Sequence, residues 1–312
     1  MPNFQNKLKS GISAGVKGGW STFIWLCEIV ILVSFPVTLL QWTGWLNQLD
    51  FLLSPLMSLL NLPPEAALPI IIGVLVNIYA VIAIITVIPF TVEQMTLIAI
   101  FTLIAHSLAM EGVVQHKSGV NVIKTSLFRL ATAILTVLIV SQFLGDTSQS
   151  VVVPATLTIH TPLLEVLKVW AVDMIYLLLK ILGIIMAIMI LLESLKSLGW
   201  IEYPRKFLRP LMKILGLSDQ TAIMWLAANL FGLFYGGALI IEEAKKGTLT
   251  KEELENLHIS IGINHSMVED PPLFMLLGLN AFWLWVPRFI VAIIAVQAYR
   301  SIKQLGKKLP HY

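Results

Sequence analysis

The chain has 312 residues, of which 57% are hydrophobic and only 12% are charged, and its net charge is +3. Soluble domains carry about 25% charged residues, so this composition argues against a soluble enzyme. The small charge, spread along the chain, argues against a nucleic-acid partner. Cys27 is the only cysteine, which excludes an intrachain disulfide and a thiolate metal cluster. The long apolar blocks predict an all-α integral membrane protein.

Crossing a hydrocarbon core of about 30 Å takes roughly 20 apolar residues in a helix. Six blocks are long enough, and the first is expected to be retained as a span and not removed as a signal peptide. These blocks are Trp20–Leu40, Ala66–Phe90, Val122–Leu144, Val169–Leu192, Thr221–Ile241 and Leu273–Val296. Four shorter apolar stretches are predicted to be re-entrant or interfacial. They are Phe51–Leu60, Met95–Met110, Phe207–Leu217 and Leu257–Val268.

The basic residues indicate how the spans are oriented. Lys and Arg gather before the first and third spans and after the fourth and sixth, whereas the loops at 41–65 and 145–167 contain none. Because basic residues favour cytoplasmic loops, this pattern predicts a multi-pass protein of the cytoplasmic (inner) membrane with both termini in the cytoplasm. The mixed, mainly acidic loop at 242–257 is accepted as an exception.

The two halves of the chain repeat each other. At an offset of 155 residues, Leu53–Met57 matches Leu208–Met212. At an offset of 159 residues, the matching pairs are His106-Ser107 with His265-Ser266, Glu111 with Asp270, and Arg129 with Arg288. Residues 1–145 and 169–312 are therefore predicted to be two membrane repeats joined by an outer linker at 146–168. Three crossings per half is an odd number, so the fold is expected to be two inverted-topology repeats, each with three membrane-crossing helices and short re-entrant or interfacial helices. Such repeats are typical of secondary transporters.

Polar residues gather where each half has a short apolar segment. Ionisable groups buried in lipid are costly and usually functional. The helix expected to begin near Pro271 would direct free N–H groups at this cluster, which suits an anion, while the neighbouring acids suit a cation or proton. The candidate substrate- or ion-binding residues are His106, Ser107, Glu111, Arg129, Asn229, Asn264, His265, Ser266, Glu269, Asp270 and Arg288.

Each candidate also has a simpler interpretation. Asp270, just before Pro271, is a suitable helix cap, and Asn229 belongs to a glycine-rich packing segment. Arg129, near the start of its span, is expected to reach the membrane surface. Arg288, roughly 13 Å from the end of its span, is expected to form an interior ion pair or to contact an anion.

Metal binding by the histidines and acids is a weaker interpretation, because there are no thiolates and no closed ligand spacing. No cofactor is therefore expected, although a coupling proton or cation is a candidate.

Three motifs carry a resemblance to a known family. They are the GW…L-x-PLM segment at Gly199–Met212, the LFYGG run at Leu233–Gly237 and INHSMVEDP at Ile263–Pro271. The chain resembles the Gate, or nucleoside-recognition, membrane family, which is similar to the spore maturation proteins A and B and to the membrane part of ferrous iron transporter B. The resemblance implies a helical-hairpin membrane fold and transport, and it leaves the substrate open. The GTP-binding loop G-x-x-x-x-G-K-[ST] of such an iron transporter does not occur.

These observations predict a permease for a small solute, with a proton as the candidate coupling ion and a binding site midway through the membrane. Its partners are expected to be the lipid bilayer, the solute and, by analogy with other transporters, a second copy in a homodimer. Two alternatives remain open. One is a non-transporting partner subunit. The other is a membrane enzyme acting on a lipid-linked substrate, with His265 as base and Arg288 as phosphate contact. No nucleophile motif supports the enzyme, so we expect none.

Overall fold

In the computed structural model, residues 4–45, 50–149, 161–200 and 205–308 are described, and among them the regular structure is helical. The elements in chain order are α1 (Phe4–Trp42), α2 (Asp50–Leu59), η2 (Pro64–Ala66), α3 (Ala67–Leu75), α4 (Ile78–Ile85), α5 (Val92–Ala105), α6 (Leu108–Lys117), α7 (Val122–Leu144), α9 (Leu163–Ser197), α10 (Arg205–Leu215), η3 (Asp219–Thr221), α11 (Ala222–Lys245), α12 (Lys251–Asn264), α13 (Asp270–Met275) and α14 (Ala281–Lys308).

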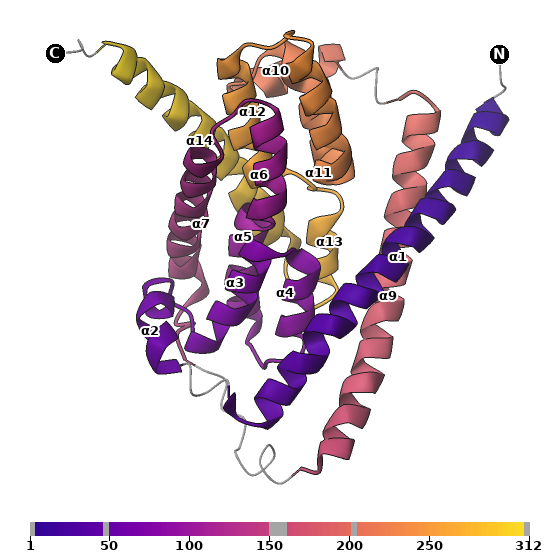
Figure 1. Cartoon of the computed structure of the whole chain (residues 1–312), viewed down its shortest axis with the longest axis vertical. Coiled ribbons are helices and arrows are strands. Elements are labelled where there is room, and N and C mark those ends of the chain that lie inside the picture. The colour runs from indigo at the N-terminus through magenta and orange to yellow at the C-terminus, as the bar shows by residue number, and fades with distance from the viewer. Residues whose placement is uncertain (1–3, 46–49, 150–160, 201–204, 309–312) are drawn as a thin grey trace.

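The two longest helices, α1 and α9, pack along each other on one side of the molecule (Figure 1). Gly11, Gly15 and Gly19 are buried at four-residue spacing on the contact face of α1. A Cβ atom on Gly15 would lie 2.5 Å from the Cα of Ile190, and one on Gly11 would lie 2.6 Å from the Cα of Ser194. Small residues at this spacing allow helix backbones to approach closely in a membrane.

The predicted crossing Ala66–Phe90 is wrong, because this block is divided between two short helices that pack on each other. Helix α3 ends at Leu75, and Asn77 begins α4 by accepting a hydrogen bond from the backbone N–H of Ala80 at 3.0 Å. The polar cap thus starts a new helix inside an apolar run, and each arm is too short to cross the membrane.

The predicted crossing Thr221–Ile241 is also not a continuous helix. The backbone of α11 breaks at Gly232, where φ is 67° and ψ is −171°, a conformation essentially restricted to glycine. Residues on either side of the break lie against each other, since a Cβ on Gly236 would be 2.5 Å from the Cα of Ala228. The block is therefore a second pair of short helical arms.

Five helical stretches are long and apolar enough to cross a membrane within the described residues, so the prediction of six is wrong. They are Phe4–Trp42, Val92–Lys117, Val122–Leu144, Leu163–Ser197 and Ala281–Gln304. The second of these contains Met95–Met110, predicted to be re-entrant or interfacial, and it is interrupted at His106-Ser107 between α5 and α6. The last begins later than predicted, because α13 and a turn occupy the chain as far as Asn280. The start of α1 and the end of α14 lie at the same end of the molecule (Figure 1).

Helices α5 and α12 share their local structure, and this positions the candidate site. Each has 14 residues and begins with a capping box, formed at Thr91 in α5 and at Thr250 in α12. Each ends at a histidine that adopts extended backbone, and the serine after each histidine has φ of 51°. The two His-Ser segments, which match in sequence, thus also have the same backbone conformation.

Candidate functional site

Two breaks in the chain bring the predicted His-Ser pairs together. Ser107 and Ser266 adopt the left-handed conformation, so neither α5 nor α12 can continue through them. The N–H of Ser107 donates to the carbonyl oxygen of Gly73 at 3.0 Å, and that of Ser266 donates to the carbonyl oxygen of Ala228 at 3.0 Å. Each break is therefore held by an arm of the hairpin in its own half, and the hairpins support the site.

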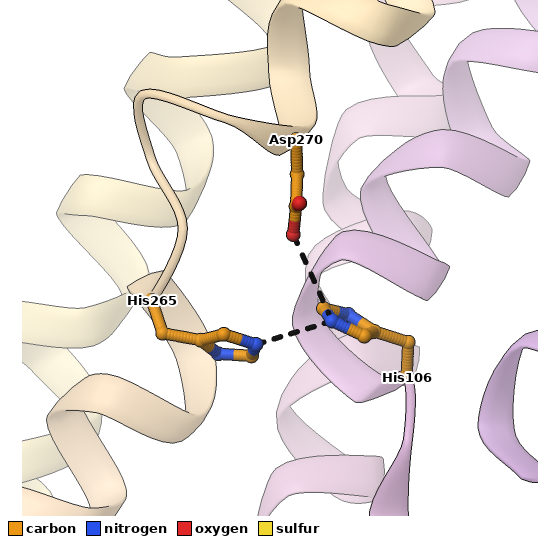
Figure 2. A group of neighbouring side chains, drawn as sticks. All are labelled: His106, His265 and Asp270. Atoms are coloured by element: carbon orange, nitrogen blue, oxygen red, sulfur yellow. Dashed lines mark hydrogen bonds and ion pairs between the residues drawn. The ribbon is translucent and has the colours of Figure 1, made fainter. Parts of the chain in front are cut away.

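The two histidines face each other in the protein interior (Figure 2). His106 and His265 are 5% and 2% exposed, and their Nε2 atoms lie 3.1 Å apart. Each Nδ1 atom lies near a carbonyl oxygen four residues earlier, at 2.9 Å from Thr102 for His106 and at 2.8 Å from Ile261 for His265. A carbonyl oxygen can only accept, so each Nδ1 carries the hydrogen and, in a neutral ring, each Nε2 is left as an acceptor.

Asp270 points at the same place from the start of α13 (Figure 2). Its Oδ2 atom lies 3.7 Å from Nε2 of His106 and accepts no hydrogen bond from the described residues, although the side chain is buried. The interpretation of Asp270 as a helix cap is wrong, because the residue is inside α13 and its N-cap position is Glu269. Asp270 is instead a buried carboxylate directed at two histidines.

Arg129 and Glu111 form an ion pair in the interior, with both side chains 3% exposed. The Nε atom of Arg129 also donates to the carbonyl oxygen of Ile104 in the last turn of α5. The expectation that Arg129 would reach the membrane surface is therefore wrong. The other oxygen of Glu111 lies 3.5 Å from Nδ1 of His265, so the pair adjoins the histidines.

Arg288 lies deep in the interior, as expected, and is fully buried. Its expected ion pair or anion contact is not among the described contacts. Its guanidinium donates instead to the carbonyl oxygens of Ile263 at 3.1 Å, Leu103 at 3.0 Å and His265 at 3.0 Å. The final carbonyl groups of a helix lack partners within it. Arg288 thus donates hydrogen bonds to carbonyl oxygens at the ends of both α5 and α12, and in this way it joins the two halves of the chain.

The remaining predicted residues surround this group. Glu269 accepts a hydrogen bond at 2.9 Å from the hydroxyl of Tyr79. Tyr79 is not among the predicted site residues, because a tyrosine in an apolar run has no distinguishing motif. Asn264 is fully buried, and neither of its amide atoms has a partner among the described residues. Asn229 donates to the carbonyl oxygen of Trp225 in its own helix, a structural contact. The hydroxyl of Ser107 donates to the carbonyl oxygen of Val76.

We call this group the polar centre; its members are His106, Glu111, Arg129, Asn264, His265, Glu269, Asp270 and Arg288. It holds three carboxylates and two guanidinium groups, so with neutral histidines and ionised acids its formal charge is −1. An excess negative charge away from water favours binding of a cation or uptake of a proton. The arrangement therefore suits a positively charged species.

Among curated proteins, the chain is similar to the uncharacterized membrane protein YvoD of Bacillus subtilis (strain 168). The two are 26% identical over 294 residues, which cover 93% of this chain and 94% of that protein. The likeness therefore extends over nearly the whole of both proteins, and within the described residues five helical stretches are long and apolar enough to span a membrane. The chain is a multi-pass membrane protein. No family model matches it, and neither does any solved structure.

Proposed function

We propose that this membrane protein is a permease for a small solute and that the polar centre is its transport site. The observation that carries the proposal is the contact between His106 and His265, which brings together the ends of two broken helical segments from different halves of the chain. Broken helices that direct polar groups at a common interior point are typical of secondary transporters.

We further propose that residues 1–145 and 169–312 are inverted repeats. Each contains a broken pair of short arms, a 14-residue helix ending at His-Ser and a long helix with a buried arginine, and these similarities support a duplication. Inverted repeats and membership of the Gate family would both fit these helical hairpins. The start of α1 and the end of α14 lie at one end of the molecule (Figure 1), which supports placing both on the same side of the membrane. From the basic residues that flank the spans, we propose that this side is the cytoplasm and that the membrane is the inner membrane.

The polar centre suggests how transport would be coupled. Asp270 is buried, and its Oδ2 atom faces His106 and accepts no hydrogen bond from the described residues, so Asp270 is the group we assign to bind and release a coupling proton. Arg288 and Arg129 hold the ends of the broken helices in place. We assign no catalytic reaction to the protein, and a homodimer remains part of the proposal.

Flux into proteoliposomes tests the proposal directly. Purified protein would be reconstituted and uptake of a panel of labelled small solutes measured with and without an imposed pH gradient. We expect uptake of at least one solute, stimulated by the gradient and lost in Asp270→Asn. His258→Gln is the matched control, because His258 is also buried on α12 but lies about two turns from the polar centre.

Two outcomes would contradict the permease, and a third would contradict the role of Asp270. Folded protein that moves no solute and co-purifies with a stoichiometric partner would favour the subunit interpretation. Product formation from a lipid extract would favour the enzyme. Uptake that is unchanged in Asp270→Asn would remove the charge of Asp270 from the mechanism.

A further inference from the structure

We propose that His106, His265 and Asp270 form a binding site for a divalent first-row transition-metal ion. Their Nε2, Nε2 and Oδ2 atoms all lie within 4.8 Å of one another (Figure 2). This inference concerns what occupies the polar centre and does not depend on whether the protein transports a solute. It departs from the expectation, drawn from residue spacing alone, that the histidines would not bind a metal.

The first argument is the pairing of two acceptors. Because both Nδ1 atoms donate to carbonyl oxygens, the two Nε2 atoms carry lone pairs and yet lie 3.1 Å apart. Two lone pairs at that distance repel each other unless a positive species lies between them. A tetrahedral metal ion with metal–nitrogen bonds of about 2.0–2.1 Å holds two nitrogen ligands roughly 3.3 Å apart. The observed separation is close to that value.

The second argument is the third ligand. Asp270 is 4% exposed, and its Oδ2 atom accepts no hydrogen bond from the described residues while lying 3.7 Å from Nε2 of His106. A proton shared between the two histidines would leave this carboxylate oxygen without a partner. A metal ion would use all three atoms. The geometry thus favours a metal over a shared proton.

The surroundings have the features of a metal site. A histidine that binds a metal usually donates its other ring N–H to a carbonyl or carboxylate, which fixes the ring and its tautomer. Both histidines do so here, and the Oε1 atom of Glu111 lies 3.5 Å from Nδ1 of His265 without forming a hydrogen bond to it. The negative formal charge of the polar centre also favours a cation.

The donor set indicates the class of metal. Two imidazoles and one carboxylate suit Zn²⁺, Fe²⁺, Co²⁺ and their neighbours, whereas Mg²⁺ and Ca²⁺ require oxygen ligands. Three protein ligands also leave a coordination position for water or a substrate. We therefore choose Zn²⁺ to measure affinity and Co²⁺, whose visible absorption reports its ligands, to identify the site.

The experiment uses the full chain, purified in detergent, stripped with a chelator and titrated with Zn²⁺ against an indicator. We expect one Zn²⁺ per wild-type chain, and affinity at least about 10-fold weaker in His106→Gln, His265→Gln and Asp270→Asn. His258→Gln should bind like the wild type. Co²⁺ should give visible bands in the wild type that are lost or shifted in the three variants.

Two results would overturn the site: a wild-type chain that binds neither ion, or binding that is equal in the three variants and in His258→Gln. The first would favour the shared proton. If one of the three variants does not elute as folded protein, the Co²⁺ spectra of the other two variants test the site. If the protein binds metal but moves no solute, the metal site stands and the permease is contradicted. If it moves a solute but binds no metal, the permease stands and the metal site is contradicted.

Discussion

The buried ion pair between Glu111 and Arg129 allows the polar centre to be tested by protein stability. Replacing Arg129 with Met removes the charge that balances Glu111 and the donor to the carbonyl oxygen of Ile104. Replacing Glu111 with Leu leaves the guanidinium without its carboxylate. Because each single change leaves a buried charge uncompensated, we expect each to destabilise the protein, whereas the double variant removes both charges together.

The size of the effect follows from burial. Breaking one partner of a fully buried pair costs about 3–5 kcal/mol in soluble proteins. Polar contacts in membrane proteins are weaker, since the unfolded segments find other partners in the bilayer, so we expect about 3 kcal/mol for each single variant. The double variant should lose clearly less than the sum, which corresponds to a coupling energy of at least about 2 kcal/mol.

The assay is unfolding in mixed micelles with increasing sodium dodecyl sulfate, followed by tryptophan fluorescence. Lys246→Met is the control, because it breaks ion pairs with Glu242 and Glu243 on the exposed surface and should cause no measurable loss. Single variants as stable as this control, or losses that simply add in the double variant, would refute the buried pair.

Three further predictions concern backbone contacts and charge. Gly15→Leu should destabilise the α1–α9 contact by about 1–3 kcal/mol, while Gly183→Ala, where a Cβ meets nothing within 4 Å, should be neutral or stabilising in the same unfolding assay. Gly232→Ala should cost about 1–3 kcal/mol, because φ is 67° and the new Cβ would lie 2.8 Å from Oγ of Ser266. Asp270→Asn should abolish gradient-driven uptake while leaving thermal stability within about 1 kcal/mol of the wild type, since the Oδ2 atom that faces His106 accepts no hydrogen bond from the described residues.

Each of these has a result that would contradict it. Equal stability of Gly15→Leu and Gly183→Ala would place α1 and α9 further apart than described. A stable Gly232→Ala would mean that α11 does not break at this residue. Parallel loss of uptake and stability in Asp270→Asn would indicate a structural role for the carboxylate.

The sequence predicted those features that residue type alone indicates. The repeated His-Ser pair and the acids beside it predicted that His106 and His265 would belong to the binding site, because buried polar residues stand out in an apolar chain. The apolar blocks likewise predicted a helical membrane protein. These signals depend on residue type alone, so they can be recognised without coordinates.

The sequence was misleading where the backbone determines the outcome. Hydropathy sums over an apolar run and cannot detect that Asn77 or Gly232 divides it into two arms, so two crossings were wrongly predicted. The partners of Arg288 are carbonyl oxygens, which every residue has, and no motif marks them. The burial of Arg129 depends on Glu111, which is 18 positions earlier and becomes a neighbour only in the folded chain.

The central claim is that the polar centre is the transport site of a permease, so it must be reachable from both sides of the membrane. Labelling one cysteine tests this most directly. Cys27 is the only cysteine, so Cys27→Ser with Ser266→Cys places a single thiol beside the histidines. Sealed vesicles would be treated with a small, membrane-impermeant thiol reagent added outside, inside or on both sides. The account predicts modification from either side, at rates that change when the pH gradient is reversed. Modification from one side alone, in protein that labels fully once denatured, would contradict it.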